Sequence, residues 1–190
     1  MKAFELVSYG APTLAGIKTA SMFTTPCTNM SVLMEEMKAF NRRFAARGLR
    51  IIPLRMQKDR MLIYLFRLEM LKQDIAQQGA LSILKERGYT ACSAERCLGE
   101  LVRHLRSDEE FPHEIGLFLG YPPEDVYGFI HHRDKACKCI GEWRVYGDEA
   151  AARERFESYT LCRNVYCRNL SVGYTIEDLA VADKKAQLER

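Results

Sequence analysis

The sequence predicts an α+β fold in which a small mixed or antiparallel sheet is covered by several helices. Three observations support this class: residues 49–67 have the pattern of a β-hairpin, residues 17–24 and 137–147 each predict a further strand, and the segments between them repeat apolar residues at helical spacing. The order of elements also allows a ferredoxin-like core with a helical insertion. We expect one α+β domain over residues 1–165 and a C-terminal helical extension over residues 166–190.

The first helix is expected directly after the strand at residues 17–24. Thr28 or Ser31 can cap its N-terminus, and Gly48 is a usual residue for its C-terminal end. Its apolar residues recur at steps of four, three and four positions and therefore share one face: Leu33, Met37, Phe40 and Phe44.

The hairpin prediction rests on two β-rich runs, LRIIPLRM and MLIYLFR, on either side of the polar turn QKDR. Pro53 has no N–H to donate to a ladder, so the first run is expected to be an edge or bulged strand. The second run is apolar on both faces, which is typical of a central strand that is covered on both sides.

Helices are predicted to follow the hairpin. Residues 68–87 have a helical pattern that is loosened at Gly79 and stopped by Gly88, and Ser93 can cap a helix to about residue 106. Pro112 is expected to begin a short helix that ends at Gly120, and Pro122-Pro123 begins another.

The last elements are a strand over residues 137–147 and two further helices. In the strand, alternate residues share a face: Cys139, Gly141, Trp143 and Val145. Asp148 is expected to cap a core helix with the aligned residues Ala152, Phe156, Tyr159 and Cys162, and a joint is expected within residues 164–173. Thr175 begins a capping-box pattern, which predicts a charged, peripheral helix over residues 175–189.

Composition and charge narrow the class of protein. The seven cysteines are an odd number, the opening residues lack the apolar run of a secretory signal, and no stretch approaches about 18 uncharged apolar residues. We therefore expect a cytoplasmic protein with reduced thiols and no membrane partner. The formal net charge of +3 is too small to indicate a nucleic-acid partner.

Two runs carry a family resemblance. The first is Phe111-Pro112-His113-Glu114-Ile115-Gly116-Leu117-Phe118-Leu119-Gly120-Tyr121-Pro122, followed by Glu124-Asp125-Val126 and Gly128-Phe129-Ile130. The second is Gly141-x-Trp143-x-Val145-Tyr146-Gly147-Asp148. Together with the opening Ala11-Pro12-Thr13-Leu14-Ala15-Gly16-Ile17-Lys18, they resemble an uncharacterised bacterial family that is catalogued only as a domain of unknown function. The resemblance covers most of residues 8–163. It implies a bacterial, cytoplasmic protein, and it brings no activity from which a catalytic role follows.

The strongest candidate site is Pro112-His113-Glu114. If Pro112 is the first helical residue, His113 and Glu114 lie in the first turn, where the positive end of the helix favours a carboxylate and a neutral imidazole. His113 can then act as a base, while Glu114 orients it, binds a substrate amine or caps the helix. We name His113, Glu114 and Lys18 as catalytic candidates, because a lysine after the turn at Gly16 can hold a phosphate or carboxylate. A purely structural role for each residue stays open.

Glycine and aromatic residues extend this site. Gly116 and Gly120 are four residues apart and leave one helix face bare, so another helix or a flat ligand can approach the backbone. The ligand-binding candidates are Phe111, Gly116, Phe118, Tyr121 and Tyr146. The leading hypothesis is a cytoplasmic small-molecule-binding protein or enzyme. The residues do not decide between these two, and they name no cofactor, ligand or oligomeric state.

Two alternatives stay open. One is a non-catalytic interaction module that contacts a partner protein through Arg42, Arg43 and Arg47 or through the charged C-terminal helix. The other is a metal or redox protein that uses cysteine and histidine ligands: His131, His132, Cys137, Cys139, Cys162 and Cys167. Their spacing matches no established finger or ribbon, and the paired Cys92 and Cys97 form no CxxC motif, so we assign no metal ligand.

Overall fold

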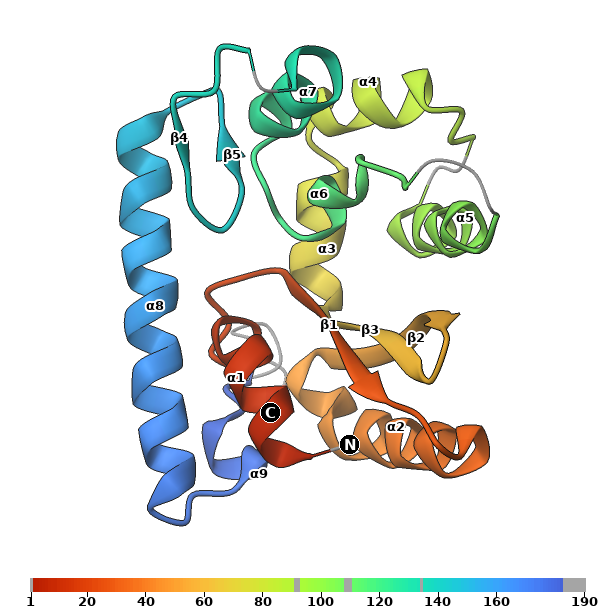
Figure 1. The fold of residues 1–190 in the computed structure, drawn as a ribbon, viewed down its shortest axis with the longest axis vertical. Coiled ribbons are helices and arrows are strands. Elements are labelled where there is room, and N and C mark those ends of the chain that lie inside the picture. The colour runs from red at the N-terminus through yellow and green to blue at the C-terminus, as the bar shows by residue number, and fades with distance from the viewer. Residues whose placement is uncertain (1, 91–92, 108–110, 134, 183–190) are drawn as a thin grey trace. The chain divides into compact units, whose positions relative to one another are not determined.

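The computed structural model describes residues 2–90, 93–107, 111–133 and 135–182, and it confirms the α+β class (Figure 1). The chain forms two compact units. The sheet unit comprises Met1–Glu69 with Tyr159–Arg190, and the inserted unit comprises Met70–Ser158. These boundaries differ from the division at residues 165 and 166 that the sequence suggested.

The sheet unit is built on three antiparallel strands, β1 (Ala20–Pro26), β2 (Leu49–Gln57) and β3 (Arg60–Arg67), in the order β1-β3-β2. The predicted hairpin is therefore confirmed, with β3 in the centre and β2 at the edge. The register shifts between Pro53 and Arg55, as expected for a proline in an edge strand. Ile63, Tyr64 and Leu65 are fully buried, so β3 is covered on both faces.

The helices of the sheet unit are α1 (Ala3–Leu14), α2 (Met30–Phe44) and the short 3₁₀ helix η1 (Ala45–Arg47). The predicted apolar face of α2 is buried in the core, whereas its N-cap is Asn29 instead of Thr28 or Ser31. Gly48 ends the segment with a left-handed φ of 77°, as its position predicted. Helix α1 was not predicted, because glycine and proline disfavour a helix and the segment contains Gly10 and Pro12.

The ferredoxin-like arrangement is not what these strands form. Within the described residues the sheet has three strands, and the remaining strands, β4 (Cys139–Ile140) and β5 (Arg144–Val145), pair only with each other in the inserted unit. The single strand predicted over residues 137–147 is therefore wrong. The chain turns at residues 141–143. Residue 141 has to be a glycine there, because the Phe156 ring lies where a side chain would be, with Cδ2 2.3 Å from an ideal Cβ.

The other elements of the inserted unit are helical: α3 (Leu68–Ile75), α4 (Gln78–Glu86), α5 (Ala94–Arg106), α6 (Ile115–Phe118) and α7 (Pro123–His132). Ser93 caps α5 as predicted, since its hydroxyl accepts from the Arg96 amide. The predicted helix over residues 68–87 is interrupted at residues 76–77, before Gly79. Gly79 instead allows close packing, because an added Cβ would lie 2.9 Å from Pro123.

Helix α8 (Glu149–Ser171) runs from the inserted unit into the sheet unit, and Asp148 caps it as predicted. It continues through most of the expected joint at residues 164–173. The capping box at Thr175 and Asp178 is confirmed, but α9 (Ile176–Leu179) is short, and Leu179 and Ala180 are buried in the sheet-unit core. Residues 180–182 are not helical, and residues 183–189 of that predicted helix lie outside the described residues.

In the described part of the chain, every helix is too short or too polar to span a membrane.

Candidate functional site

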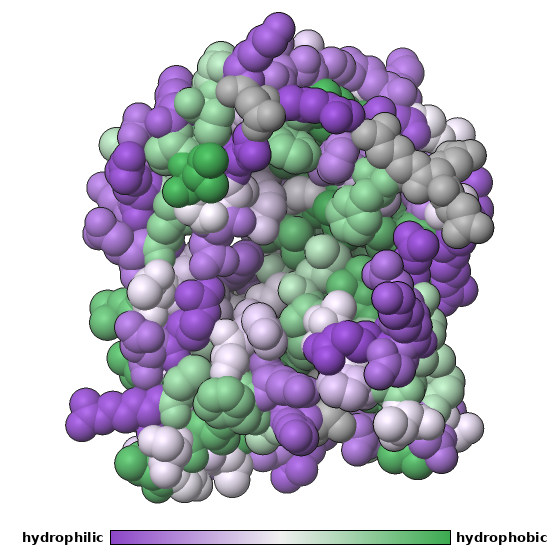
Figure 2. Space-filling model, in the orientation of Figure 1, coloured by the Kyte–Doolittle hydropathy of each residue, from purple (hydrophilic) through white to green (hydrophobic). Residues whose placement is uncertain are grey.

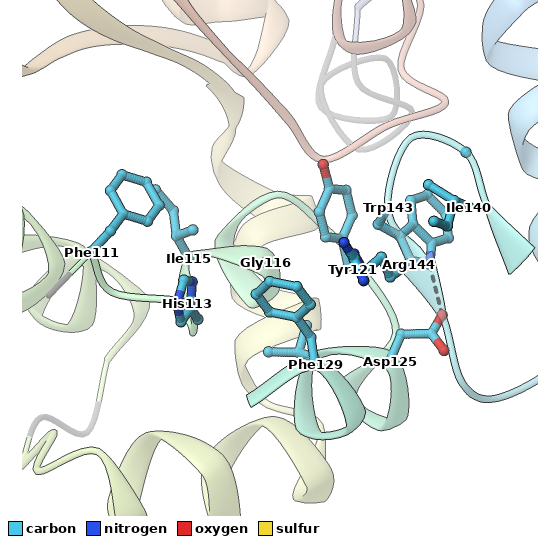
Figure 3. A pocket seen from close by; sticks show the side chains of 12 residues that line it. Phe111, His113, Ile115, Gly116, Tyr121, Asp125, Phe129, Ile140, Trp143 and Arg144 are labelled. Carbon is cyan, nitrogen blue, oxygen red and sulfur yellow. Dashed lines mark hydrogen bonds between the residues drawn. The ribbon is translucent and has the colours of Figure 1, made fainter. Parts of the chain in front are cut away.

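The inserted unit contains a cavity of about 330 Å³, which we call the aromatic cavity (Figure 3). Five rings line it: Phe111, His113, Tyr121, Phe129 and Trp143. Ile115, Val126 and Ile140 add aliphatic surface, and Arg144 adds a cation. The residues come from α6 with the segments before and after it, from α7 and from the β4–β5 hairpin, so several separate parts of the inserted unit form the wall.

The rings of the wall are held against one another. Tyr121 and Trp143 stack with centroids 4.7 Å apart, and the edge of Trp143 meets Phe156 of α8 at 4.5 Å. His113 meets Phe129 in a T-shaped pair at 5.0 Å. Aromatic pairs in these geometries stabilise a packed arrangement. The cavity therefore has a preformed wall.

Asp125 organises the hairpin side of the wall. Its carboxylate is buried and accepts three hydrogen bonds of 2.7 Å, from the Trp143 indole N–H and from the backbone N–H groups of Tyr146 and Gly147. Since both carboxylate oxygens are engaged, Asp125 positions the tryptophan and the strand end. The Gly-x-Trp-x-Val-Tyr-Gly-Asp run thus has a structural explanation.

The predicted bare face at Gly116 is covered by protein. An ideal Cβ at Gly116 would lie 2.8 Å from Val126 Cγ2 and 3.1 Å from Tyr121 Cδ2. Helix α7 is therefore the close neighbour that the glycine admits. Gly120 has a φ of 78° and serves the turn after α6.

Arg144 places a positive charge beside the apolar wall. Its guanidinium carbon lies 5.9 Å from the centroid of the Phe129 ring, a cation–π distance. A guanidinium carries five N–H donors in a planar fork and suits a carboxylate or phosphate group. The cavity thus combines flat apolar walls with one cationic group.

His113 and Glu114 lie in a turn, and the prediction that Pro112 begins the helix is wrong. Helix α6 begins at Ile115, and the Pro112 carbonyl accepts from the Ile115 N–H. The structure places the two side chains apart: His113 lines the aromatic cavity, and Glu114 lines a second cavity. Their catalytic roles stay predictions.

The second cavity, about 390 Å³, is called the polar cavity here; Glu86, Arg87, Gly88, His104, Ser107, Pro112 and Glu114 line it. The Glu114 side chain is only 2% exposed. It accepts from Tyr89 Oη at 3.1 Å and from Arg87 Nε at 3.3 Å, and His104 Nδ1 lies 3.4 Å away. Burial, followed by the Glu114 charge, raises the pKa of the Tyr89 phenol, so the tyrosine stays a donor.

The other predicted ligand-binding residues divide between wall and scaffold. Phe111, Gly116 and Tyr121 line the aromatic cavity. Phe118 is completely buried, with its ring centroid 6.1 Å from that of Tyr89. Tyr146 packs onto Gly128 of α7, where an added Cβ would lie 2.3 Å from the tyrosine ring.

Lys18 belongs to the sheet unit. It is 8% exposed, and its Nζ lies 5.3 Å from the centroid of the Tyr159 ring, a cation–π contact. The role of Lys18 in binding a phosphate or carboxylate stays a prediction.

The arginine face proposed for partner contacts is partly engaged within the sheet unit. Arg47 donates to the carbonyls of Glu177 and Ala180, and Arg43 forms an ion pair with the Glu177 side chain. These contacts hold the segment around α9. The interaction-module hypothesis stays a prediction.

The cysteine and histidine set shows no convergence in the described residues, where no group of three or more His, Cys, Asp or Glu side chains could hold a metal ion. Cys137 donates to the Cys139 carbonyl at 3.2 Å, and Cys162 and Cys167 pack against the sheet-unit core. Cys92 lies outside the described residues.

Sequence reasoning missed several residues that build the two cavities. Asp125 resembled an ordinary acidic residue in the first turn of a helix, and Phe129 resembled a core position. The partners of Glu114 come from 10, 25 and 27 positions away in the sequence, at His104, Tyr89 and Arg87. No local pattern in the sequence indicates these contacts.

The fold and cavities describe an α+β protein whose inserted unit carries an aromatic cavity and a polar cavity with one buried carboxylate, Glu114. A family model described as "Protein of unknown function (DUF3793)" matches residues 6–180, and the chain belongs to this family. No curated protein and no solved structure matches the chain.

Proposed function

We propose that the protein binds a small, flat, largely apolar molecule in the aromatic cavity. The observation that carries this proposal is the wall of five rings around about 330 Å³ of space. Ligand pockets are typically about 300–1,000 Å³ and mostly apolar, with a few placed polar groups. Here the placed polar groups include Arg144 and the His113 imidazole, beside the Asp125 carboxylate that already accepts three hydrogen bonds.

The contacts within the wall favour an open cavity that can hold a ligand over a cavity that has closed. Asp125 and the stacked Tyr121–Trp143 pair hold one side of the cavity, so closing it would break three hydrogen bonds of 2.7 Å. Ile140, at the rim, is 70% exposed. In Figure 2 hydrophobic residues, in green, reach the surface over the β4–β5 hairpin. An apolar ligand would cover part of this surface.

We also propose a cytoplasmic location. The six described cysteines are free thiols. Free thiols are usual in a reducing compartment, whereas exported proteins of this size commonly carry disulfides.

Trp143 provides the test, because it is the chain's single tryptophan and lines the cavity. Its indole N–H gives one resonance in a ¹H–¹⁵N spectrum. Titration with 2-naphthol, a flat neutral probe, should shift this resonance saturably. The proposal fails if the resonance does not respond at probe concentrations up to the solubility limit.

A matched pair of variants localises the effect. Ile140→Asp places a charge at the exposed rim and should weaken 2-naphthol binding about tenfold, since the bound probe would cover the carboxylate and remove part of its water. Leu81→Asp makes the same change at a 49% exposed residue of α4 that does not line the cavity, and it should leave binding unchanged. Equal weakening by both variants would contradict the assigned site.

A further inference from the structure

The polar cavity has an excess of negative charge in its walls. Glu86, Arg87 and Gly88 stand at the C-terminal end of α4, and His104 and Ser107 stand at the C-terminal end of α5. Each helix C-terminus carries about half a negative charge, which favours a cation nearby. Residues at the C-terminal ends of two helices, α4 and α5, therefore line the cavity.

The carboxylates add to this charge. Glu114 is buried, and the cationic Arg87 lies beside it, with Nε 3.3 Å from Oε2. Glu86 is a second carboxylate in the wall, with its own side chain 55% exposed and Oε2 3.6 Å from His131 Nε2. Arg87 thus balances one of the two carboxylates that line the cavity. The other basic residues near these helix ends, Lys85, Arg103 and Arg106, are in the last turns of α4 and α5 and do not line the cavity.

His104 supplies an acceptor. Its Nδ1 lies 3.4 Å from Glu114 Oε1, and since an ionised carboxylate only accepts hydrogen bonds, this arrangement places the ring proton on Nδ1. Nε2 is then the acceptor of the neutral ring. Arg103, an exposed residue of α5, already brings a cationic N–H donor to this atom, with Nη2 3.3 Å from Nε2.

We propose that the polar cavity binds a small molecule carrying a protonated amine, which donates to His104 Nε2 in place of Arg103 and pairs with the Glu86 carboxylate. The ammonium group takes the position and the donor role that the guanidinium has in the structure. A carboxylate or phosphate ligand is disfavoured, because it would face Glu86 and two helix C-termini. This site is separate from the aromatic cavity, so either proposal can fail alone.

The test uses the full-length protein and three probes of matched size: n-butylammonium, n-butanol and butyrate. The readout is the backbone amide shifts of Gly88 and Ser107, which line the cavity. At pH 7.5, n-butylammonium should give saturable shifts at both residues, and the neutral and anionic probes should give none. Butyrate shifts equal to or larger than those of the amine would overturn the proposal, as would unsaturable shifts spread over the surface.

Two variants separate binding from a structural role. Glu86→Gln should weaken amine binding about fivefold, while Glu157→Gln on α8, outside the cavity, should leave it unchanged. Arg103→Met removes the competing cation and should strengthen amine binding about threefold, an effect that a merely structural contact would not give. Weaker binding in Arg103→Met, or no difference between the two glutamate variants, would reject the site.

Discussion

At the scale of single residues, Asp125 shows how one buried carboxylate can hold a loop in place. Its two oxygens accept from one side chain and two backbone groups that lie 18–22 positions later in the sequence. Each hydrogen bond to a charged group contributes about 1.5–3 kcal/mol, and an orphaned buried donor costs about 1–3 kcal/mol. The aromatic wall thus depends on Asp125 more than on any single ring.

We expect Asp125→Ala to lower the free energy of unfolding by about 3–5 kcal/mol, because one buried indole donor and two part-buried backbone donors lose their acceptor. Asp148→Ala removes only an exposed helix cap and should cost about 1 kcal/mol. Chemical denaturation followed by Trp143 fluorescence measures both. Similar losses for the two variants would show that Asp125 does not have the role assigned to it.

Cys162 provides a second prediction at this scale. Burial raises the pKa of its thiol to about 11, and Arg163 opposes this only in part. Between about pH 9 and about pH 11 the thiol is therefore neutral in the folded state and ionised in the unfolded state. The contribution of this group to the free energy of unfolding is complete below pH 9, and it falls as the pH rises toward 11.

Because alkylation requires the thiolate, Cys162 should react with iodoacetamide about 100-fold more slowly at pH 8 in the folded protein than in denaturant. The rate should increase about tenfold per pH unit up to the raised pKa. Peptide mass spectrometry after timed labelling gives the rate for this residue. A folded-state rate equal to the denatured rate would contradict the raised pKa.

At the scale of elements, two glycines in helices have opposite environments. An ideal Cβ at Gly128 of α7 would lie 2.3 Å from the Tyr146 ring, whereas a Cβ at Gly99 of α5 meets nothing within 4 Å. We expect Gly99→Ala to stabilise the protein by about 0.5–1 kcal/mol through helix propensity. Gly128→Ala should destabilise it by about 1–3 kcal/mol through overpacking.

Thermal unfolding of these two variants, compared with the parent chain, measures the difference. Equal changes in melting temperature would mean that Tyr146 can move aside without loss. In that case the glycine in α7 would not be needed for close packing.

The elements that were predicted correctly are those whose cause is local. The hairpin was predictable because alternation and Pro53 act within a few residues, and Ser93 and Thr175 form caps within one turn. Helix α1 was missed because Gly10 has a tertiary cause: an added Cβ would lie 2.7 Å from Leu65 Cδ2 of β3. The β4–β5 turn was missed for the same kind of reason, since Phe156 and Asp125 set it from a distance.

The candidate site follows the same division. The aromatic and glycine residues around His113 were visible as a distinctive run, and three of the predicted ligand-binding residues line the cavity. The environment of Glu114 was not visible, because α4 and α5 bring its partners from elsewhere. The sequence pattern could therefore indicate where a cavity lies and not which groups meet in it.

At the scale of the whole molecule, Arg67 joins distant parts of the sheet unit. It is completely buried and donates to the carbonyls of Thr13, Leu14, Arg47 and Val181. These carbonyls belong to the end of α1, to η1 and to the segment after α9. A single guanidinium thus links the beginning, the middle and the end of the chain within this unit.

We expect Arg67→Met to destabilise the protein by more than about 3 kcal/mol, because buried carbonyls lose their donors. Arg67→Lys should recover little, since an ammonium cannot reach the same four acceptors in a planar fork. Limited proteolysis should then cut first around residues 177–182. Unchanged protease resistance in Arg67→Met would exclude this linking role.

The division of the sheet unit between both ends of the chain has a consequence for synthesis. The inserted unit is one continuous segment, Met70–Ser158, whereas the sheet unit needs Tyr159–Arg190 as well as its first 69 residues. Domains tend to fold as units while the chain emerges from the ribosome. The sequence of the inserted unit is therefore complete before that of the sheet unit. The strands of the sheet unit are translated early, but Arg67 cannot form its last hydrogen bond until Val181 has left the exit tunnel.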